Sequence, residues 1–286
     1  MYEIVKKIEV APNVHRLDIR EPNIAQKAKP GQFVIMMPDE FGEKVPMSIA
    51  DTGKDTFTIF LLELGISTAK IANMKQGDEL YSVAGPLGMP ATIENYGRVL
   101  LGGGCYGIGA IYPIAKAMKE AGNEVVTIIE ARSKYLVYFE EELRAVSDEF
   151  YISTSDGSMG TKGHVQDVLD KLIKNDQRFD HAKFIGCTYM MMNCSHITSP
   201  YKIPTTVSLN TIMLDGTGMC GCCRVSVGGE TKFACVDGPE FDGHQVDWEE
   251  LMMRKSSYHK EEMISYQTSP HICKALVENC PGEVNE

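Results

Sequence analysis

The first 95 residues alternate apolar and polar positions in short runs, a pattern that is typical of β-strands with one buried face. Proline and glycine residues separate these runs at a spacing that suits tight turns between antiparallel neighbours. We therefore predict a small antiparallel β-barrel over residues 1–95. Its clearest strands are expected at Tyr2–Val10, His15–Arg20, Gln32–Met36 and Thr56–Leu62.

Between residues 96 and 205 the pattern changes to short apolar runs that alternate with helix-like segments. Strand–helix alternation of this kind favours a parallel sheet whose neighbouring strands are joined by crossover helices. Strands are expected at Arg98–Leu101, Glu124–Glu130, Phe150–Thr154 and, as the last of the sheet, Lys183–Gly186. Helices are expected at Ala110–Ala121, Glu140–Val146 and Val165–Ile173.

Residues 206–250 contain a cysteine-rich loop, which we interpret as a third, small domain. From residue 251 to residue 286 the chain is a charged, helix-like tail that ends with Cys273 and Cys280. The spacing of these two cysteines fits no metal-binding motif, so we assign the tail no role. The expected fold is therefore multi-domain, with a β-barrel, a parallel α/β domain and a small cluster domain in sequence order.

Within the third segment, Asp215 is followed by Cys220, Cys223 and Cys235 in an Asp-x4-Cys-x2-Cys-x11-Cys pattern. With cysteine in place of the aspartate, this spacing is close to the one that holds a [2Fe-2S] cluster in plant-type ferredoxins. Zinc is the alternative, because it also accepts Cys and Asp ligands, although paired structural zinc sites usually show two Cys-x2-Cys elements. We predict a [2Fe-2S] cluster on these four residues and interpret the neighbouring Cys222 as a spare thiol.

The chain has 286 residues and a formal net charge of −11, which disfavours nucleic acid as a partner because its phosphates would be repelled. No apolar run approaches the roughly 20 residues of a membrane-spanning helix. The N-terminal residues alternate in polarity and lack the apolar core of a signal peptide. Nine cysteines without an export signal favour a reducing cytoplasm, where thiols are free to bind metal.

A glycine-rich turn with Gly103, Gly104 and Gly107 follows the first strand of the predicted parallel sheet and opens a helix. Small residues at such a turn let the backbone approach a pyrophosphate at the helix N-terminus, although a plain tight strand–helix turn would look the same. Glu130 ends the next strand, where an acid can bind the ribose hydroxyls of NAD(H) and repel a 2′-phosphate. Arg132 and Lys134 stand close by and could serve a phosphate instead, so NAD(H) is favoured over NADP(H) without being the only reading.

A second loop on the same predicted edge begins after the third strand and contains Asp156, which we include among the candidate nucleotide-binding residues. A bare Asp-Gly turn at this place would be unremarkable. Its position on the same sheet edge as the glycine-rich turn is what makes it a candidate.

These pieces, in this order, resemble the ferredoxin–NADP reductase superfamily, in which an FAD-binding barrel precedes a nicotinamide-nucleotide domain. Pro46, Met47 and Ser48 resemble the superfamily's Arg-x-Tyr-Ser flavin motif, although its arginine and its aromatic residue are replaced here by valine and methionine. The segment from Gly65 to Thr68 resembles the second flavin motif, which holds the pyrophosphate at a helix start. The resemblance therefore implies that FAD is bound by Pro46, Met47, Ser48, Leu62, Gly65, Ser67 and Thr68.

Near the end of the parallel sheet, Ile185 to Met191 resembles the superfamily's Cys-Gly-Pro-x-x-Met-Met motif at the nicotinamide side. The family cysteine is replaced by Ile185, and Cys187 stands where the proline would be. The resemblance places Cys187 near the nicotinamide without a catalytic role. A packed thiol at a strand end is the other interpretation of this residue.

With a cluster loop after the nucleotide domain, the chain resembles two related families. One is the electron-transfer subunit of type B dihydroorotate dehydrogenase, and the other is the small subunit of NADH-dependent reduced ferredoxin:NADP oxidoreductase, also called sulfide dehydrogenase. The dihydroorotate dehydrogenase subunit has a pattern of four cysteine ligands. The oxidoreductase small subunit has one aspartate and three cysteines, and this chain, with Asp215 at the first position, resembles that second pattern.

The second resemblance implies a subunit that exchanges a hydride between NAD(H) and FAD and passes single electrons through the [2Fe-2S] cluster. It also implies a larger flavoprotein partner with [4Fe-4S] clusters, in electron bifurcation among NADH, ferredoxin and NADP(H). The alternatives are the dihydroorotate dehydrogenase subunit and a non-catalytic zinc-binding module on a reductase-like scaffold.

Overall fold

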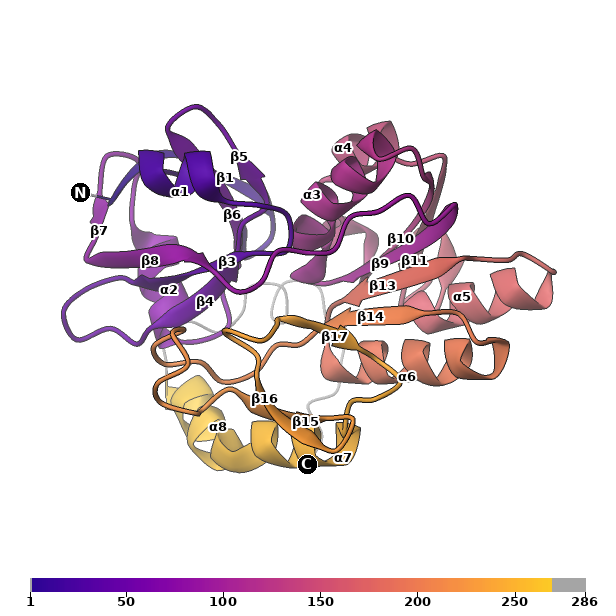
Figure 1. Cartoon of the computed structure of the whole chain (residues 1–286). Helices are drawn as coiled ribbons and strands as arrows, with labels where there is room; N and C mark the ends of the chain where they lie inside the picture. The colour runs from indigo at the N-terminus through magenta and orange to yellow at the C-terminus, as the bar shows by residue number, and fades with distance from the viewer. Residues whose placement is uncertain (1, 269–286) are drawn as a thin grey trace.

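The structure is a computed structural model that describes residues 2–268, so the expectations for Cys273 and Cys280 lie outside the described residues. Figure 1 shows three regions, an N-terminal β domain, an α/β domain beside it, and a C-terminal segment that lies below both. No helix within residues 2–268 is long and apolar enough to cross a membrane. The boundaries of the three domains remain a prediction.

The N-terminal region consists of two antiparallel sheets that share one core, as predicted for a small barrel. Alternation along the strands produces this core, since Leu17 and Ile19 of β2 and Ile59 and Leu61 of β6 are fully buried at every second position. The sheets run in the orders β5-β6-β2-β1-β7 and β4-β3-β8. The bounds are β1 Tyr2–Ala11, β2 Val14–Arg20, β3 Phe33–Met37, β4 Val45–Ser48, β5 Asp51–Thr52, β6 Thr56–Leu62, β7 Glu79–Leu80 and β8 Ser82–Leu87, with helices α1 Pro22–Lys27 and α2 Ile66–Asn73.

The second region is a seven-stranded sheet in the order β12-β11-β10-β9-β13-β14-β17, parallel except for β17. All four predicted strands and all three predicted helices of this region are present. Its strands are β9 Arg98–Gly104, β10 Glu124–Ala131, β11 Glu149–Thr154, β12 Thr161–Lys162, β13 His181–Ile185, β14 Thr205–Ser208 and β17 Glu240–Asp242. Its helices are α3 Gly107–Glu120, α4 Glu140–Ala145, α5 Val165–Lys174 and α6 Thr188–Thr198, with 3-10 turns at Lys134–Leu136 and Ser199–Tyr201.

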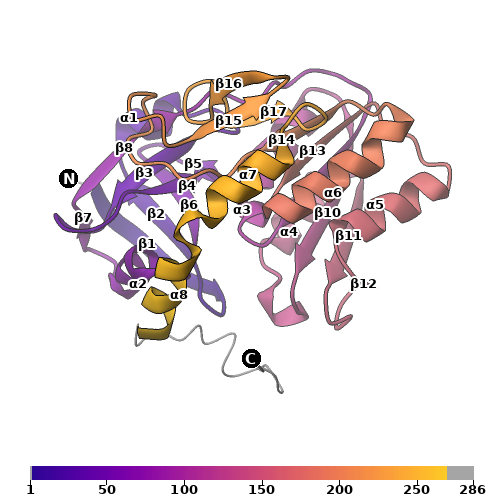
Figure 2. The same ribbon diagram turned by 90° about the horizontal axis from the view of Figure 1, so that it is seen from below.

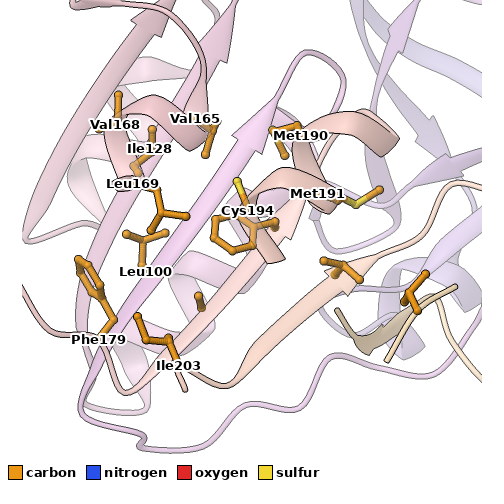
Figure 3. Close-up of a cluster of buried hydrophobic side chains, with 14 of the residues drawn as sticks. Leu100, Ile128, Val165, Val168, Leu169, Phe179, Met190, Met191, Cys194 and Ile203 are labelled. Atoms are coloured by element: carbon orange, nitrogen blue, oxygen red, sulfur yellow. The ribbon is translucent and has the colours of Figure 1, made fainter. Parts of the chain in front are cut away.

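Successive residues of each central strand point to opposite faces, and both faces are covered by helices. Leu100 of β9 packs with α5 and α6 in one cluster, whereas Leu101 packs with α3 in another. Figure 3 shows the first cluster, in which Leu169 of α5 and Cys194 of α6 lie near Leu100 and Met191 lies farther along α6. The parallel sheet is therefore buried on both faces, as its continuous apolar strands require.

The sheet does not end at β13, which corrects the prediction of Lys183–Gly186 as its last strand. The chain continues through α6 into β14, and β17 from the cysteine-rich segment then adds an antiparallel edge strand. Lys183 of β13 is almost completely buried, and its ammonium lies 2.6 Å from the carboxylate of Glu240 on β17. The cysteine-rich segment is thus joined to the nucleotide sheet by strand pairing and by a buried ion pair.

The C-terminal segment also contacts the barrel. A hairpin of β15 Arg224–Val227 and β16 Glu230–Phe233 is followed by α7 Trp248–Lys255, a 3-10 turn Ser256–Tyr258 and α8 His259–Thr268. In Figures 1 and 2, α7 lies beside the nucleotide domain and α8 continues toward the barrel. The barrel and the nucleotide domain contact each other directly, because Phe60 of β6 packs on Tyr138 and Phe139 with ring centroids 5.0 and 4.8 Å apart.

Candidate functional site

The predicted flavin-binding strand is an edge strand of the barrel. β4 pairs only with β3 within its sheet, in the register Phe33 opposite Ser48 and Val34 opposite Met47. Ser48 is exposed, whereas Pro46 and Met47 are half-buried. The strand therefore presents an accessible backbone edge and one accessible hydroxyl, which suits the binding of a planar ring system along it.

Helix α2 begins at the second predicted flavin motif, and its first turn is organised by Thr68. The Thr68 hydroxyl accepts the backbone N–H groups of Leu64 and Gly65 at 3.0 and 2.9 Å. The Ser67 hydroxyl is also engaged, with the backbone N–H and the carboxylate of Glu43 at 3.2 and 3.3 Å. Both side chains are buried, so the expected phosphate contacts from these hydroxyls are replaced by internal hydrogen bonds.

The backbone of this turn remains suited to a phosphate. The first N–H groups of a helix have no partner within the helix, and they carry the positive end of its dipole. A Cβ at Gly65 would meet no atom within 4 Å, so packing within the protein does not explain the glycine. Open space at a helix N-terminus is the arrangement that admits a pyrophosphate, and Leu62 lies just before it at the end of β6, against the nucleotide domain.

The glycine-rich turn of the nucleotide domain is shaped by close packing against the next crossover. A Cβ at Gly107 would lie 2.0 Å from the carbonyl oxygen of Ile185, and one at Gly104 would lie 2.7 Å from the sulfur of Met190. A Cβ at Gly103 would meet Ile111 at 3.0 Å. Gly104 and Gly107 therefore let the β9–α3 and β13–α6 turns approach each other, whereas Gly103 lets α3 pack closely on its own strand. The approach of the two turns brings the N-termini of α3 and α6 to one edge of the sheet.

Glu130 is not the free strand-end acid that the sequence suggested. Its carboxylate accepts the backbone N–H of Val165 at 2.9 Å and lies 3.0 Å from Nδ1 of His164, so it caps the N-terminus of α5. Only 9% of its side chain is exposed. We therefore withdraw the ribose-binding role of Glu130, because its carboxylate is turned into the protein and is already satisfied.

Asp156 and Arg132 take the exposed positions at this edge instead. Both side chains are exposed, and the backbone N–H of Asp156 donates to the carbonyl of Arg132 at 3.2 Å, so the two loops are adjacent. Hydrogen bonds from the Ser158 hydroxyl at 2.6 Å and from its backbone N–H lower the pKa of Asp156 to about 2. An ionised acid and an exposed arginine on adjacent loops are thus available where the adenosine ribose of a dinucleotide is expected.

Cys187 is the N-cap residue of α6, and its exposed thiol accepts the backbone N–H of Met190 at 3.4 Å. Cys187 lies two residues after Ile185, the last residue of β13, whose carbonyl oxygen lies against Gly107. It therefore shares the sheet edge with the glycine-rich turn. The polar residues beside it were not predicted from the sequence. Tyr106, Thr188, Asn210 and Lys255 form a hydrogen-bonded group at this edge.

The four predicted cluster ligands form two neighbouring pairs. The thiols of Cys223 and Cys235 are buried and lie 3.2 Å apart. Asp215 accepts the backbone N–H of Cys220 at 2.8 Å and that of Thr217 at 2.6 Å. These hydrogen bonds, first that of Thr217, hold the pKa of Asp215 at about 2, so an anionic oxygen donor lies beside the Cys220 thiol.

This donor set fits a binuclear cluster better than a single zinc ion. A [2Fe-2S] cluster takes two protein ligands on each iron, which matches two pairs of donors. Burial, and then the neighbouring Cys223 thiol, raise the pKa of Cys235 to about 12, so the thiolate form there needs a cationic centre to offset its cost.

The cluster loop packs against the flavin-binding side of the barrel. Cys223 and Cys235 share a small apolar core with Phe33 and Ile35 of β3. A Cβ at Gly216 would lie 3.0 Å from Ile35, so the loop lies directly on this strand. Because β3 pairs with β4, one strand separates the cluster ligands from the predicted flavin-binding residues.

Comparisons with known proteins agree with this arrangement. Residues 210–247 match the family model described as the iron-sulfur cluster binding domain of dihydroorotate dehydrogenase B. A dihydroorotate dehydrogenase B (NAD(+)) electron transfer subunit homolog of Thermotoga maritima is 46% identical, over 93% of this chain and 94% of its own length. The dihydroorotate dehydrogenase B (NAD(+)) electron transfer subunit of Fusobacterium nucleatum is 30% identical, over 86% and 97% of the two chains.

Solved structures extend the comparison to the fold. A chain from the structure of NADH-dependent reduced ferredoxin-NADP oxidoreductase, which concerns flavin-based electron bifurcation, superposes with a TM-score of 0.88 at 45% identity and covers 93% of this chain and 97% of its own. Ferredoxin-NADP+ reductase from Plasmodium falciparum shares the fold alone, with a TM-score of 0.60 at 15% identity over 72% and 95% of the chains. The predicted fold class and iron–sulfur region are confirmed. The chain belongs to the family of dihydroorotate dehydrogenase B electron-transfer subunits and their homologues.

Proposed function

We propose that this chain is the FAD and [2Fe-2S] subunit of an NAD(H)-dependent oxidoreductase and that it transfers electrons to a larger partner subunit. One observation carries the proposal: the cluster ligands Cys223 and Cys235 pack on β3, whose neighbour β4 holds the flavin motif. When bound, FAD accepts two electrons as a hydride from NADH and releases them singly, which is the chemistry that joins a nicotinamide to an iron–sulfur cluster.

The residues of the chain supply position and protection for this chemistry. The N-terminus of α2 at Gly65 offers backbone N–H groups to the FAD pyrophosphate, and Ser48 on β4 offers a hydroxyl along the isoalloxazine. The α3 N-terminus at Gly107 receives the dinucleotide phosphates, and Cys187 lies at the nicotinamide end. Phe60, packed between barrel and nucleotide domain, holds the two sites in a fixed relation.

Asp156 should decide part of the preference for NADH. We expect Asp156→Asn to weaken NADH binding about tenfold, because an ionised acceptor for the ribose hydroxyls is lost. NADPH binding should change less, since removing the carboxylate also removes a repulsion of the 2′-phosphate and leaves Arg132 in place. Steady-state KM values for both nucleotides measure this change.

Asp170→Asn is the matched control, because Asp170 lies on α5 and pairs with Lys174 on the same helix. It should leave both KM values unchanged. If Asp156→Asn left the ratio of the two KM values unaltered, the assignment of Asp156 to the ribose would be wrong.

The partner subunit should dock over the cluster loop. Exposed apolar residues stand next to the ligands Asp215 and Cys220 in the chain, since Leu214 is 51% and Met219 88% exposed. Apolar surface next to an exposed redox centre is the arrangement expected of a subunit interface. We propose that the partner is a larger flavoprotein with [4Fe-4S] clusters and that the complex bifurcates electrons among NADH, ferredoxin and NADP(H), as the likeness to the bifurcating oxidoreductase suggests.

Met219→Asp should weaken the complex at least tenfold, since a charge would be buried at the interface. The amount of partner that co-purifies under anaerobic conditions, quantified as flavin and iron per chain, measures the change. Tyr201→Asp, at an exposed residue of the nucleotide domain, is the control and should retain the partner. Equal retention by both variants would place the partner elsewhere.

The second candidate function is the electron-transfer subunit of dihydroorotate dehydrogenase, because several of the matched relatives carry that description. The identity of the partner separates the two candidates. Orotate formation by the native complex would favour the second candidate, and NADPH-dependent reduction of NAD+ and ferredoxin without orotate formation would favour the first.

A further inference from the structure

The last residue of helix α7 reaches the edge of the nucleotide sheet from the C-terminal segment. The Lys255 ammonium donates to the hydroxyl of Thr188 at 2.9 Å and to the amide oxygen of Asn210 at 3.0 Å. Thr188 is the first residue of α6, and Asn210 follows β14. Lys255 therefore lies at the carboxyl ends of two adjacent parallel strands, where ligands bind in sheets of this kind.

The same group of residues continues into the glycine-rich turn. Asn210 donates through its amide to the hydroxyl of Tyr106, and that hydroxyl donates to the carbonyl of Gly186 at 2.6 Å. Tyr106 is the N-cap residue of α3, and Gly186 directly precedes Cys187. Hydrogen bonds thus connect Lys255 to both turns that meet at the proposed nicotinamide end of the site.

Lys255 brings a positive charge to this edge and, in the part of the chain that the structure describes, forms no ion pair with a carboxylate. Within residues 2–268, the hydrogen-bond partners found for its ammonium, Thr188 and Asn210, are both neutral. Burial lowers the pKa of Lys255, and the Cys187 thiol and then Glu262 oppose that effect only partly. An ammonium group has three donors, and these two partners use two of them, which leaves one for a ligand.

The Lys255 ammonium is held in place because helix α7 is anchored on two sides. The neighbouring Arg254 donates to the carbonyl of Cys222 at 3.1 Å, and Leu251 and Trp248 of the same helix are buried in the core of the nucleotide domain. Helix α7 is therefore fixed at its N-terminal end by Trp248 and at its C-terminal end by Arg254. Lys255 is a rigidly placed charge rather than a mobile surface lysine.

Building on the proposed NAD(H) site, we propose that Lys255 binds the nicotinamide ring and selects its reduced form. Its free donor bonds to the carboxamide oxygen of the nicotinamide. Its charge disfavours the oxidised ring, which is a cation, relative to the reduced ring, which is neutral. The residue thus favours binding of NADH and release of NAD+, and it does so from a helix that belongs to the cluster segment.

Equilibrium binding of three ligands to the oxidised holoprotein tests this role. The ligands are 1,4,5,6-tetrahydro-NAD, which has a neutral ring with the carboxamide and donates no hydride, NAD+, which has the cationic ring, and ADP-ribose, which has no ring. Lys255→Met removes the charge, and Lys255→Gln is a second neutral variant that keeps a polar group for Thr188 and Asn210. Lys255→Arg retains the charge, and Lys260→Met, at an exposed residue of α8, is the matched control.

The quantity compared is the dissociation constant of NAD+ divided by that of tetrahydro-NAD. We expect this ratio to fall about tenfold in both neutral variants, because the repulsion of the cationic ring is lost. The dissociation constant of ADP-ribose should stay within about twofold of the wild-type value. Lys255→Arg and Lys260→Met should keep the wild-type ratio. Equal losses for all three ligands would show that Lys255 only supports the fold, and an unchanged ratio with a shifted flavin potential would assign it to the flavin. Either result overturns the proposal, whereas a wild-type protein that binds none of the ligands would instead overturn the proposed NAD(H) site.

Discussion

Cys223→Ala is expected to remove the iron–sulfur cluster while the flavin and the nucleotide sites remain intact. Cys223 is buried beside Cys235, so a water molecule from solvent cannot replace the Cys223 thiolate as a ligand of the iron. NADH-dependent electron transfer to the partner should fall on the order of a hundredfold or more, because loss of a ligand removes the only one-electron path proposed from the flavin. Reduction of ferricyanide by NADH, which needs the flavin alone, should stay close to the wild-type rate.

The adjacent Cys222 provides a closely matched control. It is half-buried, its carbonyl is bound by Arg254, and its thiol is not among the proposed ligands. Cys222→Ala should keep the wild-type iron and sulfide content and the wild-type rate of transfer to the partner. Loss of the cluster from Cys222→Ala with its retention in Cys223→Ala would show that the ligand assignment is wrong by one residue.

Glu240→Ala is expected to destabilise the protein by about 3–5 kcal/mol, because it leaves the buried ammonium of Lys183 without its partner. Only 2% of the Lys183 side chain and 12% of that of Glu240 are exposed, and the two groups lie 2.6 Å apart. The pair joins β13 to β17, so its loss should also loosen the cluster segment from the nucleotide sheet. Urea denaturation of the cofactor-loaded protein measures the change in unfolding free energy.

The double variant Lys183→Met with Glu240→Leu separates the cost of an unpaired charge from the value of the pair. Replacing a buried ion pair by apolar side chains of similar volume is often close to neutral. We therefore expect the double variant to recover most of the stability lost by Glu240→Ala. If the free energy of unfolding of Glu240→Ala were within about 1 kcal/mol of the wild-type value, the ion pair would not be buried as described, because water would already reach Lys183.

The regular elements were predictable where the sequence period was clear. Alternation identified β1, β2, β3 and β6, and strand–helix alternation identified β9, β10, β11 and β13 of the parallel sheet but not the two-residue β12. The prediction failed at α6, whose run of methionines has little amphipathic character, and at β14 and β17, which are only four and three residues long. These short strands form because they pair with the edge of a sheet that the rest of the domain provides. The local sequence pattern carries no information about that edge.

The candidate site divides in the same way. The cluster ligands were predicted from their local spacing, and the structure places Asp215 beside Cys220 and Cys223 beside Cys235. Their binding of iron stays a prediction. Glu130 was misinterpreted because an acid at a strand end has the same local sequence whether it faces a ligand or caps a neighbouring helix. Lys255 was missed because it lies 67 residues from Thr188 in sequence, and only the tertiary fold places a tail helix at the nucleotide edge.

Anaerobic mixing of the isolated chain, loaded with FAD and its cluster, with NADH tests the central claim most directly. Flavin absorbance and the electron paramagnetic resonance signal of the reduced [2Fe-2S] cluster are followed together after rapid freezing. We expect that the flavin absorbance falls first and that the cluster signal then rises at a rate that Cys222→Ala leaves unchanged. A cluster that NADH reduces without FAD, or a protein that contains zinc and no inorganic sulfide, would contradict it.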